Sequence, residues 1–258
     1  MNRGFYMGAS AMNLRAQELE VIANNLANVN TVGFKEGRVT NRSFADYLTL
    51  QQVDLGENGV NSRPLGVMTT GGSQPWLNYA VHTQGPLKYS GNPLDLALAG
   101  DGFFAVETPD GIRYTRSGNF TLDSEGTLLT QSGNAVMSDR DRPITLTGNG
   151  PIQISADGTI TQDGQEAGQL KIVAFNQINM MRPEGRNLYG YAGGTGEELP
   201  SDASVRQGYV EHSNVDSMRA MVRMIEVTRA FESAQKVVST QDEVLSGAVN
   251  TLGRVKAG

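Results

Sequence analysis

The chain has 258 residues, a formal net charge of -6 and an isoelectric point of about 5.0. This acidic balance offers no electrostatic footprint for nucleic acid and argues against an anionic membrane surface as a partner. Cysteine is absent, which excludes disulfides, thiolate nucleophiles and cysteine-ligated metals.

Neither a membrane span nor a cleaved signal peptide is predicted. No apolar run reaches the roughly 18 to 20 residues that a membrane-spanning helix needs. The opening stretch, MNRGFYMGASAMNLRAQELE, has one early arginine but lacks the uninterrupted apolar region of a signal peptide.

A helix is predicted over the first thirty or so residues. Large apolar side chains recur there every seven positions, at Phe5, Met12, Leu19 and Leu26. Ile22 widens this stripe, and such a pattern is typical of an amphipathic helix. Gly33 is expected to cap the end of the helix, and Gly33 with Phe34 to turn the chain away from it.

The end of this helix is rich in uncharged amides. The stretch VIANNLANVNTVGF, residues 21–34, has four asparagines and no charged residue. Removing an amide from water costs less than removing a charge, and an amide both donates and accepts hydrogen bonds. Asn24, Asn25 and Asn28 are therefore expected to contact neighbouring backbones or side chains in a helix packed among copies of itself. The same run is also consistent with a helix end followed by a turn.

Two different segments follow. Residues 37–84 carry scattered glycine and proline with little periodicity, which predicts an extended or loop-rich connector. Residues 85–212 alternate short apolar runs with Asp-Gly turns, which predicts a mainly antiparallel β domain. The predicted strands are LDLALAG, FFAVET, IRYTR, TLLTQ, PITLT, PIQIS and QLKIVAF.

A second helix is predicted over the last forty or so residues, with Asn214 as its cap and a length above roughly 50 Å. Its seven-residue apolar line consists of Met224, Phe231, Val238, Leu245 and Leu252. Its first half has a second apolar patch, made of Met218, Met221, Val222 and Ile225.

The predicted fold class is α+β. Residues 1–36 and 213–258 form a helical domain, in which the two helices bury their stripes against each other as a coiled-coil-like pair. Residues 37–84 connect it to the β-rich domain of residues 85–212. The low charge on the remaining helix surface favours burial among further chains, although a stripe of this kind is also what ordinary core looks like.

Other classes of protein find less support. The chain has two histidines, His82 and His212, and no paired-histidine motif, so no metal, cofactor, small-molecule substrate or catalytic residue is predicted. A peptidoglycan hydrolase would be the most reasonable enzyme, but no acid–base pair for it is evident. A surface-binding β module on a helical stalk stays open as an alternative.

Four long blocks resemble the axial rod and hook proteins of the bacterial flagellum. They are VIANNLANVNTVGFK at 21–35, GNPLDLALAGDGFFAV at 91–106, TPDGIRYTRSGNFTLDSEGTLLT at 108–130 and GYVEHSNVDSMRAMVRMIEVTRAFESAQKVVSTQDEVL at 208–245. They occur in the family's order, and the resemblance as a whole extends over most of the chain. Within the family the chain is most similar to proximal rod members, and distal rod members come second.

The resemblance implies an inner domain of terminal helices around a channel, an outer β domain, and a structural role in a torque-transmitting rod. It further implies flagellar type III export without a cleaved signal peptide and a place in the periplasmic part of the basal body. The implied partners are other copies, other rod proteins and the export apparatus. The residues expected to mediate assembly are Phe5, Met12, Leu19, Ile22, Asn24, Asn25, Leu26, Asn28, Gly33, Phe34, Met218, Val222, Met224, Ile225, Phe231, Val238, Leu245 and Leu252.

Overall fold

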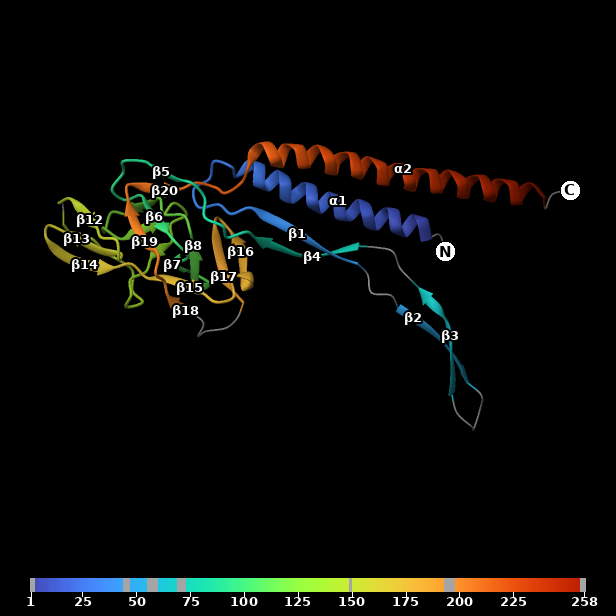
Figure 1. Ribbon diagram of the computed structural model, residues 1–258, viewed down its shortest axis with the longest axis horizontal. Coiled ribbons are helices and arrows are strands. Elements are labelled where there is room, and N and C mark those ends of the chain that lie inside the picture. Colours follow the sequence, from blue (N-terminus) through green and yellow to red (C-terminus); the bar gives the residue numbers. More distant parts are fainter. Residues whose placement is uncertain are drawn as a thin grey trace. The chain divides into compact units, whose positions relative to one another are not determined.

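The computed structural model describes residues 3–43, 47–54, 60–68, 73–148, 150–192 and 198–255. Figure 1 shows two long helices and many short strands, so the α+β class with a mainly β body is confirmed. The chain forms two compact units. Unit 1 comprises Met1–Ala23, Val39–Asn78 and Met221–Gly258, and unit 2 comprises Asn24–Arg38 and Tyr79–Ala220.

Helix α1 spans Arg3–Ala27 and ends well before Gly33, so the predicted cap at Gly33 is wrong. The side-chain amide of Asn28 donates to the carbonyl of Asn24 at 2.9 Å, and the amide of Thr31 donates to the carbonyl of Asn28 at 3.1 Å. Asparagine side chains compete with the helix for backbone groups, so the helix gives way to a turn here.

Helix α2 spans Ser217–Val255, which at 39 residues is about 58 Å long. Its cap is Asp216, whose Oδ1 accepts a hydrogen bond from the backbone of Arg219 at 3.1 Å. The predicted cap, Asn214, is wrong, because its side chain bonds instead to the backbones of Glu36 and Val81.

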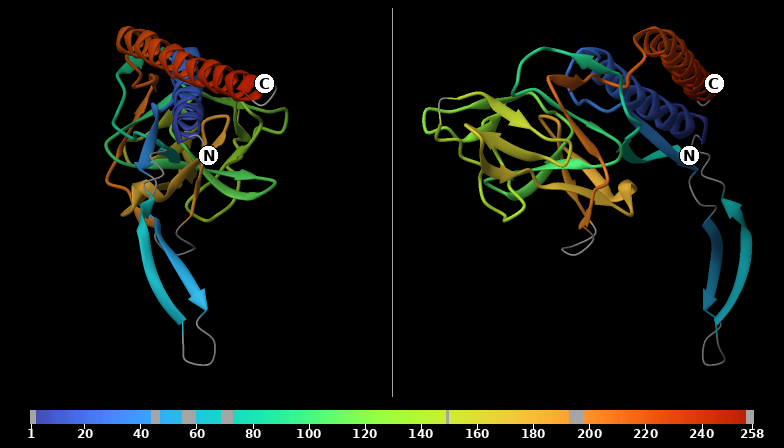
Figure 2. Two further views of the ribbon diagram at one scale, coloured as in Figure 1. Left: turned by 90° about the vertical axis from the view of Figure 1, so that its right-hand side faces the viewer. Right: turned by 60° about the vertical axis from the view of Figure 1, so that its left-hand side comes forward.

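The described parts of residues 37–84 consist largely of strands. β1 (Gly37–Ser43) pairs with β4 (Ser73–Ala80), and β2 (Tyr47–Asp54) pairs antiparallel with β3 (Val60–Met68). Both views in Figure 2 show β2 and β3 side by side. An extended connector was predicted, but its strand pairing was missed, because pairing depends on partners distant in sequence rather than on local propensity.

Unit 2 is built on one large antiparallel sheet in the order β16-β17-β8-β7-β11-β10-β9, with β15 pairing with β7 and β18. Smaller sheets join β12-β13-β14, β19-β6 and β20-β5. The strands are β5 Leu87–Tyr89, β6 Leu96–Ala99, β7 Phe103–Thr108, β8 Gly111–Thr115, β9 Phe120–Leu122, β10 Leu128–Thr130, β11 Ala135–Val136, β12 Ile152–Ile154, β13 Thr159–Gln162, β14 Gln165–Gln169, β15 Ile172–Phe175, β16 Met181–Gly185, β17 Leu188–Tyr191, β18 Glu198–Pro200, β19 Ser204–Gln207 and β20 Tyr209–Glu211, and Ile178–Met180 form a 3-10 helix.

Most predicted strands are present, but PITLT is not one. Pro143 and Thr145 form only single bridges, to Met137 and Thr127. Proline has no backbone N–H to donate to a ladder, which weakens pairing at the start of this segment.

Strand β7 is the centre of the body, because both of its faces are buried. Phe104 and Val106 lie in one hydrophobic cluster, and Phe103 and Ala105 lie in another on the opposite face. The ring of Phe104 meets that of Phe120 edge-on, with centroids 5.2 Å apart. The apolar residues 103–106 at the start of FFAVET therefore mark a strand packed on both sides.

Candidate assembly site

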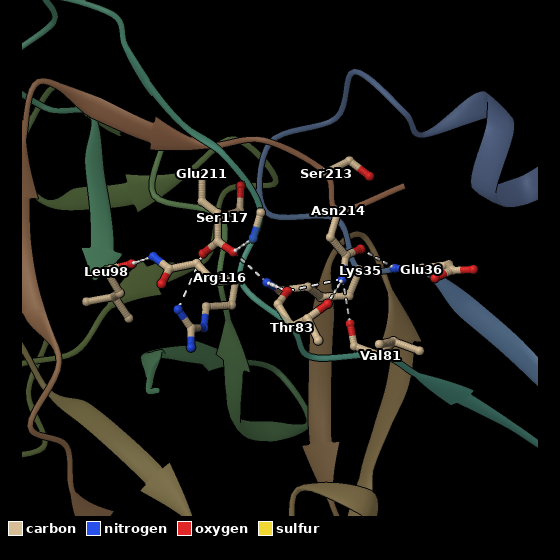
Figure 3. A network of polar contacts seen from close by, with 12 residues as sticks. Lys35, Glu36, Val81, Thr83, Leu98, Arg116, Ser117, Glu211, Ser213 and Asn214 are labelled. Atoms are coloured by element: carbon tan, nitrogen blue, oxygen red, sulfur yellow. Dashed lines mark hydrogen bonds and ion pairs between the residues drawn. The ribbon is translucent and has the colours of Figure 1, made fainter. Parts of the chain in front are cut away.

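Three chain segments meet in unit 2 next to the start of α2. They are the loop that follows α1, the segment at 81–86 between β4 and β5, and the segment that leads from β20 into α2. Backbone hydrogen bonds join them: Val81 N to Glu36 O at 2.8 Å, Gly33 N to Glu211 O at 2.7 Å, and His212 N to Pro86 O at 3.0 Å. Figure 3 shows the polar side chains gathered at this meeting point.

The centre of this meeting point is a buried ionic network, which we call the charged junction: Lys35, Arg116 and Glu211. Lys35 Nζ donates to Glu211 Oε1 at 2.5 Å, and Arg116 Nη1 donates to Glu211 Oε2 at 3.3 Å (Figure 3). The backbone of Gly85 donates to Glu211 Oε1 at 2.8 Å, and all three charged side chains are almost completely buried. One carboxylate thus joins all three segments to β8 and its following turn.

The cations of the charged junction have further acceptors. Lys35 Nζ also donates to the carbonyl of Thr83 at 2.8 Å, and Arg116 Nη2 donates to that of Gly100 at 2.9 Å. Burial lowers the pKa of both Lys35 and Arg116, and the neighbouring Glu211 carboxylate opposes that shift. Glu211 therefore supplies negative charge that offsets the burial of both cations.

His82 lies beside the charged junction as an uncharged filler. Its ring meets Phe103 and Tyr189 edge-on, at centroid distances of 5.3 and 5.0 Å. Within the described residues neither ring nitrogen has a hydrogen-bond partner. Burial, with Lys35 and Arg116 nearby, lowers the pKa of His82 from 6.5 to about 4.

Acid should therefore destabilise the wild-type protein more than the His82→Phe variant. Between pH 6.5 and 4 the unfolded chain binds a proton at His82 that the folded chain does not, so stability falls as the pH drops through this window. The lowered pKa corresponds to about 3 kcal/mol of unfolding free energy near pH 4. Urea unfolding at pH 7 and pH 4.5 measures the free energy of unfolding of both proteins. If the difference in this free energy between wild type and His82→Phe were the same at both pH values, the prediction would be wrong.

Two asparagines tie the helix ends to this meeting point. Asn25 is buried, and its side-chain amide donates to Gly37 O and accepts from Gly37 N, both at 2.8 Å. This pair of bonds resembles the one between two residues of neighbouring β-strands. Asn214 accepts from Glu36 N at 2.7 Å and donates to Val81 O at 2.8 Å (Figure 3). These amides satisfy backbone groups that no regular ladder reaches.

The side-chain amides of Asn25 and Asn28 form hydrogen bonds within the chain, and their expected role in assembly stays a prediction. Asn28 bonds to Asn24, and Thr31 donates to Asn28 Oδ1 at 3.1 Å. Asn187, at the tip of the β16–β17 hairpin, donates to Val32 O at 3.0 Å. Lys35, Arg116, Glu211 and Asn187 were not predicted to be functional. The available signal was the single charged residue, Lys35, that ends the otherwise neutral stretch of residues 21–35.

The apolar residues expected to mediate assembly differ in burial. Half-buried side chains include Met12, Leu19, Ile22, Leu26, Phe34, Met224, Phe231 and Val238. Leu245 is 43% exposed, and the side chains of Phe5 and Leu252 lie outside the described residues. Leu14 in α1 and Val227 in α2, neither of them in the expected set, are instead buried. Val227 lies about 40° around α2 from Phe231, close to the expected line, whereas Leu14 lies about 140° around α1 from Leu19, so α1 is also buried on the side away from that line.

One face of α2 is apolar and exposed, and we call it the outer stripe: Met218, Met221, Val222 and Ile225. These side chains are between 50% and 77% exposed. At 100° per residue they centre roughly 170° from buried Val227, on the opposite side of the helix. An exposed apolar stripe of this kind is typical of a surface that another chain covers.

Among the described residues, no helix is long and apolar enough to cross a membrane. The same residues contain no cluster of three or more His, Asp or Glu side chains suited to a metal ion.

Comparisons with known families match three segments of the chain. Residues 5–35 match "Flagella basal body rod protein", residues 97–162 match "Flagellar hook protein FlgE/F/G D1 domain", and residues 206–251 match "Flagellar basal body rod FlgEFG protein C-terminal". Lys35, Arg116 and Glu211 fall in the first, second and third of these segments respectively. The charged junction thus joins all three matched segments.

Similar proteins match along the whole chain. Flagellar basal-body rod protein FlgF of Caulobacter vibrioides is 34% identical over 257 residues, which cover 99% of this chain and 100% of the relative. Flagellar basal-body rod protein FlgG of Bacillus subtilis is 35% identical over 268 residues, covering 97% and 99%. Flagellar hook-basal body complex protein FlhO of Bacillus subtilis is 33% identical, covering 99% and 100%.

Proposed function

The chain belongs to the family of flagellar basal-body rod proteins, and we propose on this premise that it is a structural rod subunit that polymerises through its terminal helices into a hollow, torque-transmitting shaft. The observation that carries this proposal is the two-sided apolar character of α2. Val227 is buried on one side, whereas the outer stripe on the other side is exposed in the single chain. Subunits that add head to tail through such faces propagate a filament instead of a closed ring.

We propose that α1 and α2 pair as a coiled-coil-like inner domain. Within unit 1, a Cβ placed on Gly8 would lie 2.6 Å from Cγ2 of Val238, so the backbone of α1 passes close to α2 at this position. Glycine is the residue that permits such an approach. This approach supports the helix pairing alone. The proposed division is a helical domain at 1–36 and 213–258, a connector at 37–84 and a β domain at 85–212, whereas the compact units group Asn24–Arg38 with Tyr79–Ala220.

Gly8→Val should abolish rod assembly, because the new side chain would occupy the space of Val238 and push the helices apart. Motility of a bacterium that carries the variant as its only copy of this protein measures the loss, and electron micrographs of its basal bodies show whether the rod is complete. The matched control is Gly247→Val, since Gly247 lies in α2 with nothing within 4 Å of its added Cβ. Both changes alter helix propensity alike, so equal motility of the two strains would contradict the proposed pairing of α1 with α2.

The proposed partners are other copies of this chain, other rod proteins and the flagellar export apparatus. The proposed location is the periplasmic part of the basal body, reached by type III export without a cleaved signal peptide. We assign the chain no catalytic role. The surface-binding stalk is not favoured, because the relatives that match the whole chain are named rod proteins. A proximal position in the rod stays a prediction, since relatives named FlgF and FlgG match at 34% and 35% identity.

A further inference from the structure

We propose that Met218 and Met221 are oxidation sites that control assembly: converting their thioethers to sulfoxides removes the contact between the outer stripe and a second copy of this chain. The inference rests on the proposed function and adds a modification that switches it. Met218 is 77% exposed and Met221 is 50% exposed. Both methionine side chains are therefore accessible to solvent in the unpolymerised chain.

The surface that would cover the outer stripe is the exposed face of α1 in a second copy. Ala9, Ala16 and Ala23 are exposed and seven residues apart, so they form one line of small side chains on that helix. Large side chains of the outer stripe fit over such a line, as ridges fit into grooves. Methionine suits the contact because its flexible, polarisable side chain adapts to an irregular surface.

Charge complementarity supports the same occupant. Glu20 is exposed and lies on the alanine-lined face of α1, and Arg229 is exposed and follows Ile225 by one turn on the face of the outer stripe. The apolar part of each face carries no charge of its own. Docking the two faces therefore places opposite charges at the edge of an apolar contact, where they fix register more than affinity.

The chemistry needs a hydroperoxide as the oxidant. Its O–O bond breaks, one oxygen atom forms a bond to the thioether sulfur, and hydrogen peroxide leaves as water. The sulfur loses two electrons and the peroxide gains them, so the step balances without another reactant. The product is a polar sulfoxide, which would have to be buried without a hydrogen-bond donor at the contact.

The first experiment treats the purified full-length chain with hydrogen peroxide and maps sulfoxides by mass spectrometry, before and after polymerisation. In the free chain, Met218 and Met221 should oxidise at least about tenfold faster than buried Met137 and Met181. Polymer should protect them at least about fivefold, whereas Met180, exposed on the 3-10 helix, should oxidise alike in both states. Equal oxidation of Met221 in free chain and polymer would overturn the inference.

The second experiment asks whether oxidation controls assembly. Peroxide treatment should lower the amount of polymer formed by the wild-type chain at least about tenfold. The double variant Met218→Leu, Met221→Leu should still polymerise after the same treatment, because leucine conserves volume and cannot be oxidised. Met180→Leu is the matched control and should stay peroxide-sensitive. Polymerisation of wild-type chain that carries both sulfoxides would contradict this inference alone, whereas failure of unoxidised chain to polymerise would count against the proposed function.

A charge exchange tests the occupant independently. Glu20→Arg and Arg229→Glu should each weaken polymerisation, and the two together should restore it to within about threefold of wild type, because the pair is re-formed with reversed sign. Additive losses in the double variant would show that these two faces do not meet. Sedimentation of the polymer measures all three variants at one salt concentration, since salt screens exposed pairs.

Discussion

Replacing Glu211 by alanine is expected to lower the free energy of unfolding by about 3–5 kcal/mol. The carboxylate is buried and accepts hydrogen bonds from Lys35, Arg116 and the backbone of Gly85. Its removal would leave two buried cations without their ion-pair partner, and burial already disfavours the charged form of both. Urea unfolding of the purified variant at pH 7 measures the loss.

The control is Glu226→Ala on the surface of α2. Glu226 pairs with Arg223 at 3.2 Å, but both side chains are exposed, so its loss should change the unfolding free energy by less than about 1 kcal/mol. Glu211→Gln separates charge from shape, because glutamine keeps the volume and one acceptor but no charge. If Glu211→Ala were no more destabilising than Glu226→Ala, the charged junction would have no structural role.

An ionic junction specifies geometry in a way that an apolar contact does not. A cluster of leucines at the same place would bury similar area, yet it would tolerate sliding of one segment on another. Lys35, Arg116 and Glu211 instead fix three segments through directed bonds of 2.5 to 3.3 Å. The charged junction therefore defines the positions of these three segments within unit 2.

The strands of the body were predictable because their signals are local. FFAVET alternates its side chains between two buried clusters, and the Asp163-Gly164 pair forms the two-residue turn from β13 to β14 with φ values of 54° and 79°. Turn chemistry and short apolar runs bounded by turns are properties of neighbouring residues. The pairing of β1 with β4 and of β2 with β3 gave no such signal and was missed.

The junction itself was not predictable from one sequence. Lys35 and Glu211 are 176 residues apart, and Arg116 and Glu211 are 95 apart. Nothing in the local pattern distinguishes a lysine that enters the core from one on the surface, because burial of a charge depends on its partner. Asn25 illustrates the same limit. Its amide was expected to serve contacts to other chains, yet it bonds to Gly37 within its own chain.

Gly33→Ala should lower the free energy of unfolding by about 3–5 kcal/mol, nearly as much as Glu211→Ala, because two effects act at one residue. Its φ of 71° is unfavourable for a residue with a side chain. In addition, the new Cβ would lie 2.4 Å from Ser117 N and 2.6 Å from Arg116 C, both backbone atoms that cannot rotate away. Relief would require the loop after α1 to move, which would break the bond from Gly33 N to Glu211 O.

Gly164→Ala separates the two effects. Gly164 has a similar φ of 79°, but nothing lies within 4 Å of an added Cβ. The free energy of unfolding of this variant should therefore fall by only about 1–2 kcal/mol. The remaining difference between the two variants measures the close approach of the loop to Ser117. Equal losses would mean that the loop adjusts freely and that Gly33 is needed for its backbone angle alone. A larger loss at Gly33, accompanied by incomplete rods in the cell, would tie the position of this loop to assembly, since Gly164 lies in a hairpin turn away from the charged junction.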